Sequence, residues 1–156
     1  MPSLKLPTGT DHGPLILGSG TIDYGLSLSA SIETFRFYGL WDLFTWGHST
    51  QDTGIRTGTI FGFDSDWGIH SYHDMDKNMD IFAMVGLNAR YHNPDSGPGN
   101  VGRHTDGKTL EIVSTLIGYK DSLMIKAMYH ILIYANLNGI QLAPTSGFQV
   151  GIGRAF

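Results

Sequence analysis

The sequence has 156 residues, a net charge of −4 and no cysteine. This length suits a single domain, and the lack of cysteine excludes disulfide scaffolds, thiolate metal sites and cysteine nucleophiles. The negative net charge excludes a strongly basic surface for nucleic acid, so we expect no nucleic-acid partner. Glutamate, which favours helix interiors, occurs only at Glu33 and Glu111, whereas aspartate, which favours turns, is common. This balance argues against a helical bundle.

The N-terminal segment resembles neither a targeting sequence nor a membrane-spanning helix. No stretch of the chain reaches the roughly 18–20 apolar residues that such a helix needs. The first 17 residues contain three prolines and no continuous apolar run, which is unlike a secretory signal peptide. We therefore expect either a cytoplasmic protein or the mature chain of an exported one.

Apolar and polar residues alternate with a period of two along much of the chain, which predicts strands with one apolar face. The first run, over residues 22–32, places Tyr24, Leu26 and Leu28 on one side and mostly serines on the other. Polar turn sequences separate the runs, at residues 47–54, 64–66, 74–79, 93–108, 120–122 and 138–147. In chain order, the predicted strands are residues 22–32, 35–46, 55–63, 67–73, 80–92, 110–119, 123–137 and 148–156.

Strands of even spacing with polar turns between them favour an all-β sandwich or barrel. We predict a closed antiparallel up-and-down β-barrel of about eight strands. It forms a single domain over residues 1–156, in which residues 1–14 are an N-terminal extension. Because a barrel of this size fills its interior with side chains, we do not expect a wide pore.

Most ionisable residues of the predicted strands fall on the face opposite the apolar one, and two kinds of barrel produce this pattern. A soluble barrel turns its apolar face inward, whereas an outer-membrane barrel turns it toward lipid and fills its lumen with polar residues. Small polar residues dominate the polar face here, and its few positive and negative charges are nearly equal in number. This composition favours an internal network in which charges of opposite sign are paired. We predict that a polar network, lining the lumen or binding a ligand, consists of Asp23, Arg36, Asp42, Arg90, Glu111, Lys126 and His130.

The C-terminal residues 147–156 alternate Phe148, Val150 and Ile152 with small or polar residues, and they end in Phe156. This ending resembles the last strand of bacterial outer-membrane β-barrel proteins, whose terminal phenylalanine is recognised by the machinery that assembles them. The resemblance implies a location in the bacterial outer membrane, with outer-membrane lipid and the barrel-assembly machinery as partners. Arg154 departs from the pattern, because the family more often has an aromatic or aliphatic residue there.

Two further motifs contain residues of chemically active types. Residues 102–109 fit the expression of a phosphate-binding P-loop, but a P-loop joins a buried strand to a helix, and here a loop precedes alternating sequence. His70, His73, Asp74 and Asp76 are possible metal ligands by type. Positions 70 and 73 of a regular strand point to opposite faces, so these histidines converge only if the chain bends between them. We therefore predict no metal and no other cofactor.

We expect a small outer-membrane β-barrel of structural, adhesive or narrow-channel type that is not an enzyme, because no catalytic constellation stands out. The alternative is a soluble lipocalin-like β-barrel, located in the cytoplasm, that binds a small apolar ligand in its interior. The two hypotheses differ in the environment of the apolar face. It meets lipid in the first and forms the interior in the second.

Overall fold

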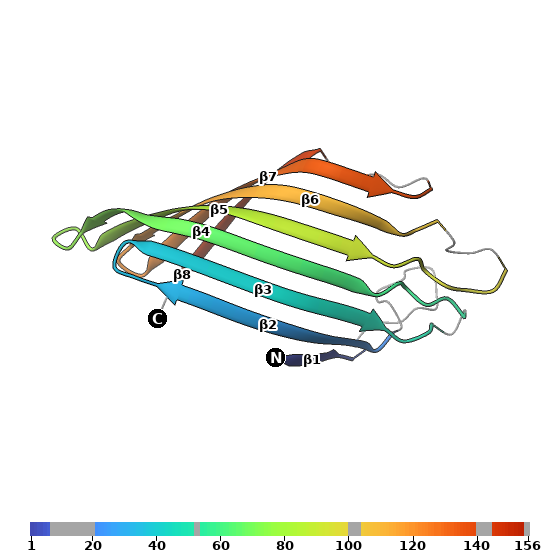
Figure 1. Ribbon diagram of the computed structural model, residues 1–156. Coiled ribbons are helices and arrows are strands. Elements are labelled where there is room, and N and C mark those ends of the chain that lie inside the picture. Colours follow the sequence, from blue (N-terminus) through green and yellow to red (C-terminus); the bar gives the residue numbers. More distant parts are fainter. Residues whose placement is uncertain (7–20, 52–53, 100–103, 140–144, 155–156) are drawn as a thin grey trace.

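The computed structural model describes residues 1–6, 21–51, 54–99, 104–139 and 145–154, whose strands form one antiparallel sheet (Figure 1). Each strand pairs with its neighbours in sequence order, so the topology is up-and-down throughout. Among the described residues, none belongs to a helix long and apolar enough to cross a membrane. The strands are β1 (Pro2–Lys5), β2 (Asp23–Glu33), β3 (Phe37–His48), β4 (Ile60–Asp74), β5 (Met79–His92), β6 (Gly107–Lys120), β7 (Leu123–Leu137) and β8 (Ser146–Arg154).

The register of the strand pairs assigns the strand side chains to two faces. Leu28 of β2 lies opposite Leu43 of β3, which lies opposite Phe63 of β4. In the next row, Ser29 lies opposite Asp42 and points to the other side of the sheet. Because side chains alternate along a strand, such rows alternate across the sheet between an apolar face and a polar face.

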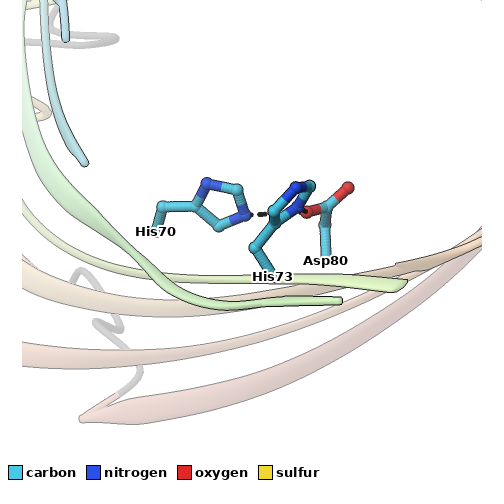
Figure 2. A group of neighbouring side chains, drawn as sticks. All are labelled: His70, His73 and Asp80. Atoms are coloured by element: carbon cyan, nitrogen blue, oxygen red, sulfur yellow. Dashed lines mark hydrogen bonds and ion pairs between the residues drawn. The ribbon is translucent and has the colours of Figure 1, made fainter. Parts of the chain in front are cut away.

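The sheet is strongly curved, and the polar face is its concave side (Figures 1 and 2). Figure 2 shows polar-face side chains of β4 and β5 projecting from the inner side of the curve. The curvature also brings Asp66 of β4 within electrostatic range of Lys126 of β7, although two strands lie between them in the sheet. The apolar face is therefore the convex, outward side.

Burial in this sheet differs from that of a soluble domain. Within the described part of the chain, Val113 is the one large hydrophobic residue that is buried, and it lies on the polar face of β6. Large aliphatic and aromatic side chains of the convex face remain exposed instead. Soluble monomers rarely leave such contiguous apolar surface uncovered.

The predicted all-β fold with antiparallel up-and-down strands is confirmed, but two strand assignments were wrong. Residues 60–63 of one predicted strand and 67–73 of the next belong to the single strand β4, because residues 64–66, predicted as a turn, continue the ladder. Residues 55–59 lie before this strand. Asp64 in that segment pairs with Arg90 on the polar face, so a polar sequence is stabilised inside a strand. The additional strand is β1, within the predicted N-terminal extension, of which residues 7–14 lie outside the described residues.

The observed hydrogen bonds do not close the sheet into a barrel. Over the described ranges, β1 pairs with β2 and β8 pairs with β7, while no pairing joins β1 to β8. One of these edges is short, because β1 contributes only 4 residues. The structure thus shows an open, curved, eight-stranded sheet where the sequence predicted a closed barrel.

Candidate functional site

The apolar face forms a continuous uncharged band on the convex side. Leu28 is 73% exposed, Leu43 56% and Val85 54%, although each lies within a strand. Trp41 and Trp67 pack edge to face in the same band, with ring centroids 4.8 Å apart. Along the described strands, charge appears on this face only at strand ends. Among the outward-facing strand residues that the structure describes, the charged ones are Asp74, Lys108, Lys120 and Arg154.

A bidentate ion pair occupies the polar face between β4 and β5. The two terminal guanidinium nitrogens of Arg90 donate to the two carboxylate oxygens of Asp64, at 2.5 and 3.0 Å. The Arg90 guanidinium also lies 4.8 Å from the ring centroid of Phe44 on β3. Gly62 separates these two residues in the register, and a Cβ there would lie 2.1 Å from the Phe44 ring. Glycine at position 62 therefore lets Arg90 and Phe44 approach each other, so that the guanidinium contacts the Asp64 carboxylate and the Phe44 ring.

A second cluster surrounds Asp23 at the start of β2, where three parts of the chain meet. The Asp23 side chain is 7% exposed. Its carboxylate accepts hydrogen bonds from Thr21 Oγ1 at 2.8 Å and Lys5 Nζ at 3.1 Å, and it lies 2.8 Å from His48 Nδ1. Because Lys5 belongs to β1 and His48 to β3, this carboxylate links the edge strand to the rest of the sheet.

The remaining members of the predicted network lie in separate places. Asp42 accepts a hydrogen bond from Ser29 Oγ at 2.8 Å. Glu111 and His130 face each other across β6 and β7, with 3.8 Å between Oε2 and Nδ1. Arg36 lies in the turn between β2 and β3, and its carbonyl accepts a hydrogen bond from the His70 amide. The seven predicted residues are thus distributed over several local groups and do not converge on one site.

His70, His73 and Asp80 form a cluster that the predicted network did not include (Figure 2). The ladder between β4 and β5 shifts register between His70 and Tyr72, which is a β-bulge. The extra residue returns His73 to the face of His70, so this bulge supplies the bend that the two histidines need in order to converge. Asp74 is not part of the cluster, because its carboxylate pairs with Lys77 at 3.0 Å in the turn that follows.

Sequence reasoning also missed His48 and Lys5 as partners of Asp23. The alternation of β2 placed Asp23 on the polar face, but the sequence did not indicate which residues of the neighbouring strands would contact its carboxylate. The P-loop interpretation is excluded by local structure, since β6 begins at Gly107, where a P-loop would require a helix. Residues 100–103, which contain the start of that motif, lie outside the described residues.

No protein-family model matches this chain, and neither does any curated protein or solved structure. The C-terminal segment that resembles outer-membrane barrel endings forms β8, and its Phe148, Val150 and Ile152 are exposed on the apolar face. Arg154 lies at the end of that strand, and Phe156 lies outside the described residues. Two features of the molecule therefore bear on function, namely the contrast between the two faces of the sheet and the side-chain clusters on the polar face.

Proposed function

We propose that this chain is an integral β-barrel protein of the bacterial outer membrane, of structural, adhesive or narrow-channel type and without catalysis. The observation that carries the proposal is the exposed apolar face, whose charges are confined to strand ends. In water this surface would favour aggregation, whereas lipid is an environment of matching polarity. Charged residues at the ends of the strands suit the two headgroup regions, where long side chains reach polar surroundings.

The concave face supports the same proposal, because two of its ion pairs join charges of opposite sign on neighbouring strands. Arg90 with Asp64, and Lys5 with Asp23, neutralise each other on the side that would line a lumen. In a membrane the edges of β1 and β8 must also be satisfied, since unpaired backbone groups are costly in hydrocarbon. We propose that these two strands meet there and close the barrel.

The paired side chains favour a structural interior over a reactive one. A barrel of about eight strands has room for side chains and little else, so the protein would act through a narrow passage or through its loops. The segment between β5 and β6 is a candidate for partner contacts, since binding residues gather on loops held by a rigid scaffold. Through residues 147–156, the outer-membrane assembly machinery is the expected partner during insertion.

The soluble lipocalin-like alternative requires the opposite arrangement of faces. Such a barrel would turn Leu28, Leu43 and Val85 toward an enclosed ligand and present charged residues to water. The outward exposure of these three side chains argues against it.

Refolding in buffer and in detergent micelles tests the proposal. We expect the chain to aggregate in buffer, to become monodisperse and β-rich in micelles, and to migrate anomalously in SDS until it is boiled. The boiled sample is the matched control, because it has the same mass without the folded barrel. A monomeric, folded β-protein in buffer alone would overturn the proposal.

A further inference from the structure

We propose that His70, His73 and Asp80 bind one divalent transition-metal ion, with Zn²⁺ as the best fit. The site lies on the polar face, at the end of the sheet where a turn joins β4 to β5 (Figure 2). The inference does not depend on whether the apolar face meets lipid, because it concerns the other side of the sheet.

The β-bulge in β4 creates the site from residues that a regular strand would separate. Ser71 is the extra residue, so His73 emerges on the same face as His70. Asp80 lies directly opposite His73 in the register of the hairpin, and its carboxylate comes within hydrogen-bonding distance of both rings. Bulges often redirect a side chain in this way near functional sites, so three ligands converge from a spacing that appears unsuitable in the sequence.

The donor atoms already lie close together. Asp80 Oδ1 is 2.8 Å from His70 Nε2 and 2.5 Å from His73 Nδ1, and the donor atoms of the three residues lie within 4.8 Å of one another. Zinc binds such atoms at about 2.0–2.2 Å in a tetrahedral arrangement. Two imidazoles and one carboxylate are therefore near the required spacing, and small side-chain rotations would admit the ion.

Packing holds the inner ligand in place. The His70 ring stacks on Phe82, with centroids 4.4 Å apart and an interplanar angle of 11°. Phe82 in turn contacts Tyr38 and Tyr119 edge to face. An aromatic shell of this kind fixes the orientation of a ligand and excludes water from one side of the metal.

The outer ligands are accessible to an incoming ion. The side chains of His73 and Asp80 are 38% and 31% exposed, whereas that of His70 is 14% exposed. A hollow beside them is lined by Phe35, Arg36, His70, Ser71, Tyr72 and His73. It leaves space for a water or anion as fourth ligand, and the positive charge of Arg36 favours an anion there while opposing the bare cation.

Titration of the folded wild-type protein with Co²⁺, followed by displacement with Zn²⁺, tests the site. We expect one Co²⁺ per chain, with the visible absorption of a four-coordinate ion that Zn²⁺ abolishes. His73→Gln should weaken binding by about tenfold or more because it removes one of three ligands. The matched control is His92→Gln, which alters a histidine of the same face outside the cluster and should leave binding unchanged.

Two further variants keep the outcome decisive. Asp80→Asn removes the charge but preserves shape, and it should also weaken binding, whereas Arg36→Gln should strengthen it. Circular dichroism establishes that each variant is folded. The inference is overturned if the wild type shows no Co²⁺-dependent absorption, or if folded His73→Gln and Asp80→Asn bind as the wild type does. In that case the cluster is a hydrogen-bonded histidine–carboxylate group only.

Discussion

Replacement of Ile131 by arginine tests directly what the apolar face contacts. Ile131 lies near the middle of β7, opposite Ile112 of β6 and Ser146 of β8. Its side chain points outward from the convex face, and the residue is 40% exposed, so a longer side chain fits without displacing a packed core. The outward residues opposite it are uncharged, so the new guanidinium would have no carboxylate to pair with.

The expected magnitude depends on the surroundings of that face. In a bilayer, arginine at the midplane of a barrel's outer surface costs about 2–4 kcal/mol. At about 1.4 kcal/mol per factor of ten, the folding equilibrium constant would fall roughly 30-fold to several hundredfold. In water, a substitution at an exposed position changes stability by less than about 0.5 kcal/mol. The two environments therefore predict effects that a denaturant titration separates clearly.

Urea titration in phospholipid vesicles, monitored by tryptophan fluorescence, measures the effect. The control is Asn136→Arg, because Asn136 is an outward-facing, already polar residue near the end of the same strand. Near the interface the same charge should cost about 0–1 kcal/mol. A free energy of unfolding for Ile131→Arg within about 0.5 kcal/mol of wild type, or equal to that of Asn136→Arg, would refute lipid contact at this face.

Three further predictions concern the interior and the C-terminus. Arg90→Ala removes both hydrogen bonds to Asp64, so the free energy of unfolding should fall by about 1–2 kcal/mol after allowance for solvent screening. Arg90→Lys keeps the positive charge and should recover part of this loss. Gly62→Ala places a Cβ against the Phe44 ring and should lower the free energy of unfolding by about 1–3 kcal/mol. Gly147→Ala places its Cβ in open space and should change that free energy by under about 0.5 kcal/mol. Equal effects of the two substitutions would contradict the close packing of Gly62 against Phe44. Deletion of Phe156 should impair membrane assembly in cells but leave refolding in micelles nearly intact, and equal loss of both would indicate a packing role alone.

The strand pattern and the two faces could be predicted because alternation is a local property of the chain. A period of two fixes on which side each side chain lies once the backbone is extended. The run over residues 22–32 accordingly became β2 with the predicted faces, and the apolar residues of 123–131 lie outward on β7. The pairing of polar residues was predicted only as a general property, because a partner on another strand depends on register.

Three features were decided by tertiary structure. Residues 64–66 look like a turn, but Arg90 supplies a partner for Asp64 from β5, which lets β4 continue through them. Residues 2–5 have no strand pattern of their own, and they become β1 because β2 offers an edge to pair with. The bulge after His70 exists only in the ladder between two strands, so the convergence of His70 and His73 is invisible in their spacing. In each case the deciding interaction joins residues far apart in the sequence, whereas alternation is encoded in neighbours.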